Sequence, residues 1–195
     1  MTTSEQDSAA ALRRKRNLKC LAYVVAGVIG QTMIIVVFAL VIMRIRTPRV
    51  RLSSVSVETL VTNSTASSPS FSMRLTAELS VKNTNFGNFK YESSNVTISY
   101  RGTPVGDAII NKAQAWFRST KKADIAVSLS SDKVGLDGSQ LGGDLNSSRI
   151  SLVAEAKLMG KVHLFFVFKK KKSVEMNCTV DVNTETKNVE NLTCK

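Results

Sequence analysis

The chain has 195 residues, 43% of them hydrophobic and 22% charged, and 27 Lys and Arg against 15 Asp and Glu give a formal net charge of +12. This length suits one domain of ordinary size, and the composition argues against an extensively disordered chain. A single histidine, His163, excludes sites that need two, and the sequence contains no phosphate loop, dinucleotide fingerprint or hydrolase motif. We therefore expect a protein that is not an enzyme, with no catalytic residues, metal site or cofactor.

The positive charge is concentrated toward the N-terminus. Residues 1–51 contain nine Lys and Arg against two acidic residues, and these basic residues flank an apolar run. A nucleic-acid-binding surface instead carries Lys and Arg along one face with aromatic side chains between them. We therefore expect no nucleic-acid partner, and we predict a basic cytoplasmic tail over residues 1–20.

The apolar run covers residues 21–43 and is free of charge for 23 consecutive residues. As a helix it would be roughly 35 Å long, enough to cross a hydrocarbon core of about 30 Å. A cleaved signal peptide has an apolar region of only about 7 to 15 residues that ends at small residues, whereas this run continues into Arg44-Ile45-Arg46. The pattern predicts an uncleaved signal-anchor helix over residues 21–43, with the lipid bilayer as its partner and a basic juxtamembrane linker over residues 44–53.

Small residues recur at intervals of four within this run, at Ala22, Ala26 and Gly30. Such a stripe allows a second helix to approach closely, so a homo-oligomer formed through the transmembrane helix is one interpretation. The other interpretation is that small residues are simply common in spanning helices. Cys20, at the cytoplasmic boundary, is a candidate for palmitoylation.

The charge bias does not set the orientation of the span, because five basic residues precede it and four follow it closely. Five Asn-X-Ser/Thr triplets are readable only on a lumenal or external face, and their asparagines are Asn63, Asn95, Asn146, Asn177 and Asn191. Cys178 and Cys194 lie 16 residues apart, which suits a disulfide in an oxidising compartment, with two free buried thiols as the alternative. We expect a cytoplasmic N-terminus and an extracellular or lumenal C-terminal domain, most simply at the plasma membrane.

Beyond the linker, the hydrophobic pattern has a period of two. From Phe71 to Val81 the odd positions are apolar and the even positions polar, which predicts a half-buried strand. The same alternation recurs over residues 96–100, 125–129, 150–158, 162–168 and 174–182. Several short alternating strands predict an antiparallel β-sandwich or barrel over residues 54–195.

The segments between these runs carry turn signals. Arg101-Gly102-Thr103-Pro104 and Met159-Gly160-Lys161 each separate two alternating runs and predict turns. The longest segment, residues 130–148, is either a long loop or carries one short helix built around Leu136, Leu141 and Leu145.

Aromatic residues adjoin basic residues in two places. Phe165-Phe166-Val167-Phe168 precedes Lys169, Lys170, Lys171 and Lys172. This is either a strand buried on both faces that runs into a solvated turn, or a patch in which Phe165 and Val167 meet lipid headgroups or an acidic wall polymer. Trp116 and Phe117 precede Arg118 and form a similar edge, unless the tryptophan belongs to the core.

His163 is out of phase with Val162 and Leu164, so we expect it on the surface rather than in the core.

Two motifs resemble a known family. Residues 81–91 (VKNTNFGNFKY), followed by residues 96–106 (VTISYRGTPVG), resemble the signature of the plant late embryogenesis abundant group-two family, also described as hydroxyproline-rich glycoprotein or harpin-induced and disease-resistance-like proteins. The resemblance extends from the basic head to the C-terminal tail. Thr84 departs from it, since many members have proline there, so the turn is less constrained in φ.

The resemblance implies an immunoglobulin-like or fibronectin-like antiparallel β-sandwich behind one transmembrane helix, with a role in abiotic stress and pathogen responses. Asn83, Asn85 and Gly87 would form a structural turn. We expect a non-enzymatic membrane protein whose exported sandwich binds a protein or cell-wall partner. The alternative is a lipid-binding or membrane-contact module that handles apolar ligands.

Overall fold

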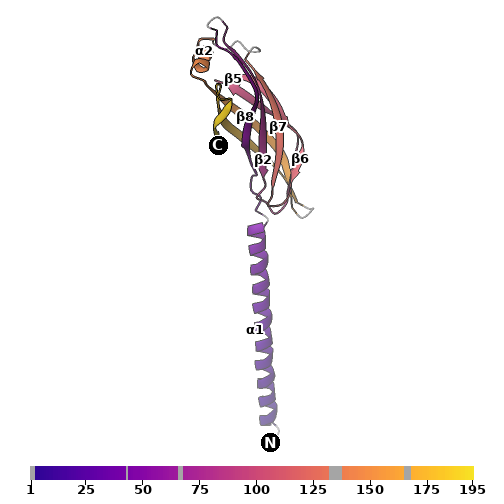
Figure 1. Cartoon of the computed structure of the whole chain (residues 1–195). Helices are drawn as coiled ribbons and strands as arrows, with labels where there is room; N and C mark the ends of the chain where they lie inside the picture. Colours follow the sequence, from indigo (N-terminus) through magenta and orange to yellow (C-terminus); the bar gives the residue numbers. More distant parts are fainter. Residues whose placement is uncertain (1–2, 43, 66–67, 132–137, 165–167) are drawn as a thin grey trace. The chain divides into compact units, whose positions relative to one another are not determined.

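The computed structural model describes residues 3–42, 44–65, 68–131, 138–164 and 168–195. It divides into two compact units, Met1–Arg44 and Ile45–Lys195. The first unit contains one helix, and the second is built mainly of antiparallel β-strands (Figure 1).

The helix of the first unit, α1, covers Thr3–Ile42. Its segment Arg14–Val41 is long and apolar enough to cross a membrane, which is true of no other helix in the described parts of the chain. The helix begins well before the apolar run, so the basic residues of the tail continue the same helix. Thr32, within the run, donates its hydroxyl to the Val28 carbonyl at 2.6 Å, which satisfies this polar group within the helix.

The second unit contains two antiparallel sheets. The smaller sheet has the order β1–β2–β7, formed by β1 (Arg49–Asn63), β2 (Ser70–Lys82) and β7 (Thr120–Ser130). The larger sheet has the order β10–β9–β8–β3–β6, formed by β10 (Asn188–Cys194), β9 (Phe168–Asn183), β8 (Arg149–Leu164), β3 (Asn88–Tyr91) and β6 (Ala113–Ala115). A further hairpin of β4 (Ser94–Tyr100) and β5 (Thr103–Ile110) joins it, because β4 pairs with β8.

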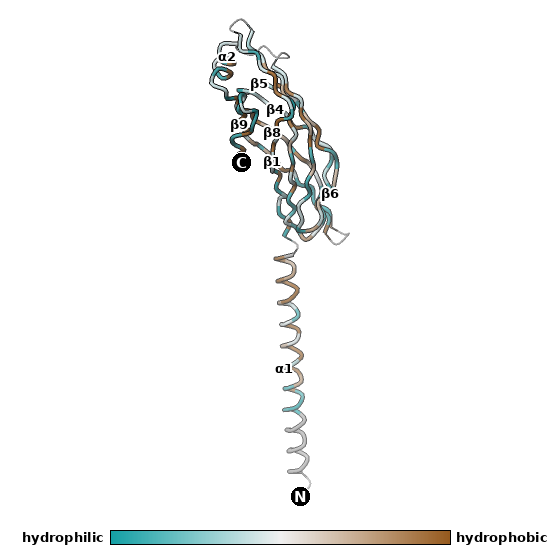
Figure 2. The backbone as a smooth tube through the Cα atoms, viewed as in Figure 1, coloured by the Kyte–Doolittle hydropathy of each residue, from teal (hydrophilic) through white to brown (hydrophobic). Residues whose placement is uncertain are grey.

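The core lies between the two sheets. In β2, the predicted inward positions from Phe71 to Val81 are buried, while the alternate side chains are partly or fully exposed. β4, β7, β8 and the second half of β9 show the same alternation, which Figure 2 displays as alternating colours along the strands. Each large apolar side chain buried in this way contributes about 1.5 to 3 kcal/mol. The predicted β-sandwich is confirmed.

The first strand begins earlier than expected. Arg49–Asn63 forms β1, so residues 49–53, which we assigned to a linker, belong to the sandwich. Val50 and Leu52 are buried while Arg49 and Arg51 are exposed, so the inward-outward alternation begins at residue 49. In the sequence alone, these arginines resemble juxtamembrane charge, and the alternation with Val50 and Leu52 is too short to indicate a strand.

The turn predicted at Met159-Gly160-Lys161 is wrong, because β8 runs without interruption from Arg149 to Leu164. Gly160 is required instead by close packing with β3: a Cβ atom there would lie 2.5 Å from the Lys90 carbonyl oxygen and 2.6 Å from the Phe89 ring. The glycine therefore marks a close contact between strands, which a single sequence does not distinguish from a turn.

The solvated turn considered at the lysine run is also absent. Lys169–Lys172 form part of β9 and pair with residues 160–163 of β8. Phe165 and Val167, which we proposed as part of an apolar patch, lie outside the described residues. The adjoining Phe168 is exposed.

The segment after β7 contains one short helix, α2 (Gly138–Asn146), which lies at one end of the sandwich (Figure 1). Leu141 and Leu145 are both buried, which accounts for their spacing of four residues. This settles the alternative in favour of a helix. Leu136 lies outside the described residues.

Candidate functional site

The Asn83–Gly87 turn fastens three segments together at the end of the sandwich opposite α2. Asn83 is 1% exposed, and its amide donates to the carbonyl oxygens of Gly87 at 2.7 Å and Trp116 at 2.9 Å, with that of Ala115 at 3.2 Å. Its side-chain oxygen accepts the backbone N–H of Asn85 at 3.0 Å. One buried side chain therefore joins the turn to the β6–β7 connection, which explains why an asparagine stands here.

Asn85 likewise joins the turn to the first residues of the domain. It is 2% exposed, and its amide donates to the Arg46 carbonyl at 2.8 Å while its oxygen accepts the Arg46 N–H at 2.5 Å. The side chain thus pairs with both polar backbone groups of one residue, as a neighbouring strand would. Arg46 is consequently held against the sandwich three residues before β1 begins. We call this end of the sandwich the Arg46 end.

Gly87 completes the turn for a steric reason. It is buried, and a Cβ atom there would lie 2.1 Å from the carbonyl oxygen of His163 in β8. The three motif residues therefore lie together and have a structural role. The sequence identified the turn but gave no sign that its partners are Arg46 and the β6–β7 connection.

Exposed aromatic side chains lie in and around the Asn83–Gly87 turn. Trp116 is 64% exposed and Phe117 61% exposed, so the interpretation of the single tryptophan as a core residue is wrong. Phe86 is also exposed, and the Arg118 guanidinium lies 5.0 Å from the centre of its ring. Phe86 and Phe117 line one open groove with a volume of about 460 Å³. We call Phe86, Trp116 and Phe117 the aromatic cluster.

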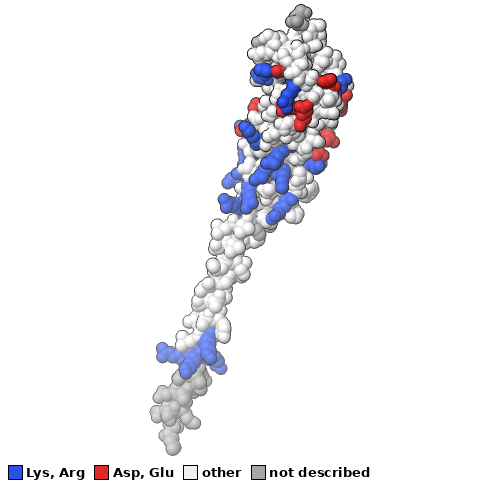
Figure 3. Space-filling view, turned by 60° about the vertical axis from the view of Figure 1, so that its left-hand side comes forward, with Lys and Arg blue, Asp and Glu red and all other residues white. Residues whose placement is uncertain are grey.

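The Arg46 end is strongly basic. On the face that Figure 3 shows, one end of the sandwich carries mainly Lys and Arg, and Asp and Glu lie toward the other end, among further Lys and Arg residues. The segments that converge at the Arg46 end contain Lys or Arg but no Asp or Glu; they are residues 44–53, 80–90, 112–122, 160–164 and 168–173. Glu78 pairs with Lys122 at 3.0 Å, and Glu92 lines a groove with Lys161 and Lys171, but the basic residues of these segments outnumber these two neighbouring carboxylates.

Three of these lysines face one another across adjacent strands. Lys90 of β3 lies opposite Lys161 of β8, and Lys161 lies opposite Lys171 of β9. All three are exposed. Like charges directly opposite one another destabilise a sheet, so this row costs the isolated domain stability and suits an anionic ligand.

His163 lies in the same groove as Lys90 and Lys169. It pairs with Lys169 across the sheet and is partly exposed, as its phase predicted. Burial, together with the charges of Lys90, Lys169 and Lys161, lowers the pKa of His163 below its usual 6.5. Burial is the larger cause, and the three lysine charges act in the same direction.

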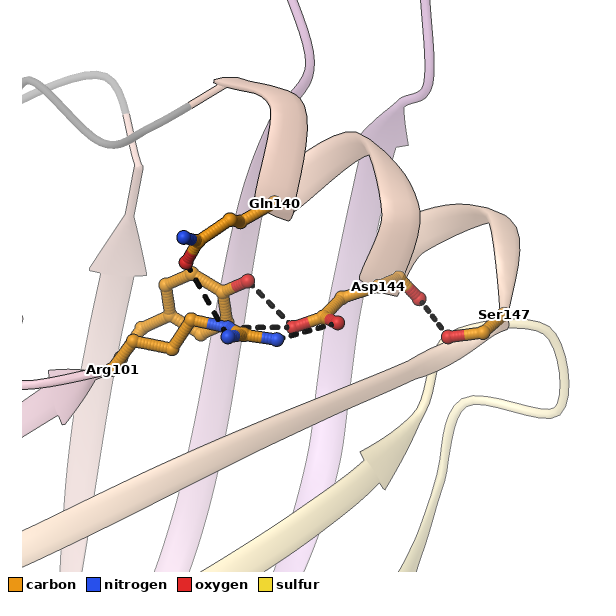
Figure 4. Close-up of polar contacts among 5 residues, drawn as sticks. Arg101, Gln140, Asp144 and Ser147 are labelled. Carbon is orange, nitrogen blue, oxygen red and sulfur yellow. Dashed lines mark hydrogen bonds and ion pairs between the residues drawn. The ribbon is translucent and has the colours of Figure 1, made fainter.

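The α2 end is organised differently, by a network that the sequence did not reveal. The Tyr100 hydroxyl donates to Asp144 of α2 at 2.6 Å, and the Arg101 guanidinium donates to both carboxylate oxygens of Asp144 at 3.0 and 3.1 Å (Figure 4). The Arg101 side chain also donates to Gln140 at 3.3 Å. The predicted Arg101-Gly102 turn positions this arginine, with φ of 47° and 82° as a two-residue hairpin turn requires.

These contacts shift the pKa of two groups. Burial, and then the hydrogen bond to Asp144, raise the pKa of Tyr100 to about 12. The hydrogen bond from Arg101 is the main cause that lowers the pKa of Asp144 below 3.8. Both shifts hold the tyrosine neutral and the aspartate ionised at neutral pH, which is the state that the network needs. Its chemistry is structural, since the charges satisfy one another.

The remaining predicted residues are distributed as follows. Cys178 and Cys194 form a disulfide that joins β9 to β10, as predicted. The five sequon asparagines are exposed, and their glycosylation stays a prediction; they are Asn63, Asn95, Asn146, Asn177 and Asn191. Ala22, Ala26 and Gly30 are exposed on α1, and helix pairing through them also stays a prediction.

Two further observations limit the chemistry of the domain. An apolar cavity between the sheets, lined by residues such as Leu75 and Leu152, has a volume of about 30 Å³, whereas small-molecule pockets measure about 300 to 1,000 Å³. Within the described ranges, no group of three or more His, Cys, Asp or Glu side chains is placed to hold a metal ion. The exposed aromatic and basic groups of the Arg46 end are therefore the candidate functional surface.

Comparisons with known proteins agree with the resemblance found in the sequence. A family model described as late embryogenesis abundant protein (LEA_2) matches residues 78–180. The Late embryogenesis abundant protein At1g64065 of Arabidopsis thaliana is 28% identical over 185 residues, which cover 91% of this chain and 83% of that protein.

Solved structures also match the chain. The solution structure of AT1g01470 from Arabidopsis thaliana has 14% identity, covers 71% of this chain and 83% of that chain, and gives a TM-score of 0.39. A crystal structure of a protein from Archaeoglobus fulgidus has 12% identity, covers 68% and 97% of the two chains, and gives a TM-score of 0.38. The family match spans the Asn83–Gly87 turn and most strands of the sandwich, and the chain belongs to the LEA_2 family of late embryogenesis abundant proteins.

Proposed function

We propose that this protein is a non-enzymatic, single-pass membrane protein whose β-sandwich lies outside the cytosol and binds a partner during abiotic stress or pathogen responses. The observation that carries the proposal is α1, whose segment Arg14–Val41 has the length and apolarity of a membrane span. Family membership supports the link to stress. The plasma membrane is the proposed location.

The proposed orientation is supported by the surface of the sandwich. All five sequon asparagines have exposed side chains, so an oligosaccharide would meet no packed core at any of them. The disulfide between Cys178 and Cys194 is of the kind that persists outside the cytosol. Both features support a cytoplasmic N-terminus and a lumenal or extracellular sandwich.

The size of the interior cavity favours a binding surface over an internal lipid carrier. A cavity of about 30 Å³ accommodates roughly one water molecule, not an acyl chain. The alternative lipid-handling function is therefore reduced to contact between lipid and the outer surface. The basic, aromatic Arg46 end supports this second candidate, which is developed below.

Membrane integration and orientation can be tested together by expressing the full chain in plant cells and isolating sealed microsomes. We expect the chain to resist carbonate extraction, its sandwich to be protected from added protease, and its mobility to increase after endoglycosidase treatment. Replacing sequon asparagines one at a time, as in Asn63→Gln, should remove one glycan each, whereas Asn188→Gln, outside any sequon, should remove none.

A chain released by carbonate would overturn the membrane span. An integral chain with an unglycosylated, protease-digested sandwich would instead reverse the orientation.

A further inference from the structure

The distance between the end of α1 and the Arg46 end of the sandwich is limited by chain length. Four residues lead from Ile42 to Arg46, so their Cα atoms are at most about 14 Å apart. Each headgroup layer of a bilayer is roughly 5 to 8 Å thick. If α1 spans the membrane, as proposed above, Arg46 lies within or just above the headgroups. Because Asn85 binds Arg46 through both of its backbone polar groups, the Asn83–Gly87 turn must also lie near the bilayer.

The aromatic cluster lies on this same end. Arg118 donates its backbone N–H to the Asn85 carbonyl at 3.1 Å, and Asn83 binds the Trp116 carbonyl. The exposed rings of Trp116 and Phe117 are therefore fixed beside the turn that holds Arg46. Rings of this kind are favoured at the membrane interface, where tryptophan in particular has an apolar body and a polar N–H group.

The charge of this end complements lipid phosphate. Lys90 and Lys169 line the same groove as Phe86 and Phe117, and Lys161 lies opposite Lys90 on the neighbouring strand. At the α2 end, by contrast, Arg101 is neutralised by Asp144 within the protein. Among the described residues that line the groove with Lys90 and Lys169, none is Asp or Glu, so an anionic surface can balance these lysines.

We propose that the Arg46 end docks on the headgroups of the same bilayer that α1 crosses, with Trp116 and Phe117 in the interface and Lys90, Lys161 and Lys169 against lipid phosphates. This deepens the function proposed above and rests on its membrane span. The sandwich is then seated on the membrane at a fixed surface, rather than tethered above it by a flexible stalk.

An acidic wall polysaccharide is the rival occupant of this end. It would satisfy the lysines equally well, but it gives no reason for large exposed aromatic side chains beside the tether. The length of the tether also places the Arg46 end at the lipid in the absence of any other partner. The membrane is therefore the occupant that the observations favour.

The single tryptophan allows a direct test with the full chain reconstituted in nanodiscs. Trp116 fluorescence is measured in phosphatidylcholine discs and in discs that also contain phosphatidylglycerol, with and without lipids brominated along the acyl chain. We expect a blue-shifted emission and at least twofold quenching by the brominated lipids, stronger in the anionic discs.

The matched control moves the tryptophan to the other end of the sandwich by combining Trp116→Phe with Val61→Trp. Val61 is 70% exposed and pairs with Ser72, about 33 Å along β2 from Lys82. Its fluorescence should be unaffected by brominated lipids. Equal quenching at both positions would overturn docking through the Arg46 end.

The lysines are tested by Lys90→Gln/Lys161→Gln against a control of equal charge, Lys187→Gln/Lys195→Gln, at exposed lysines outside this end. The first pair should reduce Trp116 quenching in anionic discs at least twofold, and the second pair should leave it unchanged.

Two results would contradict the proposal while leaving the membrane span intact. One is a chain that reconstitutes fully but shows no Trp116 quenching in either disc. The other is a Trp116 emission that responds only to added polygalacturonate, which would assign this end to the wall polymer. Failure of the chain to reconstitute would instead contradict the membrane span itself.

Discussion

The two ends of the sandwich use charged and polar groups in opposite ways. At the α2 end, Arg101 and Tyr100 both donate to Asp144, so the charges are satisfied within the protein. At the Arg46 end, buried asparagines satisfy the backbone, while lysines and aromatic rings remain on the surface. One end is therefore closed by its own contacts, and the other presents groups that a partner can satisfy.

This contrast separates structural motifs from functional surface. The Asn83–Gly87 turn is the most distinctive motif of the sequence, yet its two asparagine side chains are buried and bind the protein backbone and each other. Phe86 within the turn, and Trp116 and Phe117 outside it, are the residues exposed to a partner. Motif residues shared with a family can thus support a binding surface without contacting the partner themselves.

The largest effect is expected from Asn83→Ala, which removes the hydrogen bonds that hold the Asn83–Gly87 turn in place. The substitution removes the amide donor of the buried Gly87 carbonyl and the acceptor of the buried Asn85 N–H, so the free energy of unfolding should fall by about 4 kcal/mol. Urea unfolding of the detergent-solubilised full chain measures it. Asn188→Ala, at an exposed asparagine, should change stability by less than about 0.5 kcal/mol. Similar small losses for both variants would show that the turn does not hold this end together.

A smaller effect is expected at the α2 end from Asp144→Asn. The loss of the paired hydrogen bonds with Arg101 and Tyr100 should destabilise the domain by about 1 to 2 kcal/mol at neutral pH, since the pair is only partly buried. Because the pKa of Asp144 is lowered on folding, its contribution is present above pH 4 and is lost as pH falls through the folded-state pKa. Unfolding curves of both proteins between pH 7 and pH 3 should therefore converge at low pH; a constant gap would contradict the assignment.

The smallest effect is expected from His163→Gln, which tests the uncompensated charge of the Arg46 end. The pKa of His163 is lowered on folding by burial and by three lysines, so protonation destabilises the folded state, and stability should fall as pH drops below 6.5. The variant should match the original chain within about 0.5 kcal/mol at pH 7.5 and lose less stability between pH 6.5 and pH 5. Thermal unfolding at these pH values measures it, and identical pH profiles would contradict a lowered pKa at His163.

The parts of the fold that depend on local pattern were predictable from the sequence. The alternation from Phe71 to Val81, the Arg101-Gly102 turn and the disulfide between Cys178 and Cys194 all stand in the structure as expected. Each of these rests on residues near one another in the chain, where the period of two and the chemistry of turns act directly.

The parts that depend on register were not predictable. Gly160 resembles a turn residue in the sequence, and only its close packing against β3 shows why a glycine is needed there. Lys90 lies opposite Lys161 only because β3 pairs with β8. The contact between Tyr100 and Asp144 joins residues 44 positions apart. Trp116 is a further case, because neither its type nor its neighbours indicate that the β6–β7 connection turns it outward.

The positions of the five sequon asparagines have a consequence for how the mature molecule is recognised. None of them lies in the segments that converge at the Arg46 end; Asn63 ends β1, and Asn146 ends α2. Sugars attached at all five would therefore coat the flanks and the outer tip of the sandwich and leave the Arg46 end bare. The Arg46 end would then be the surface that a partner can approach without meeting an oligosaccharide.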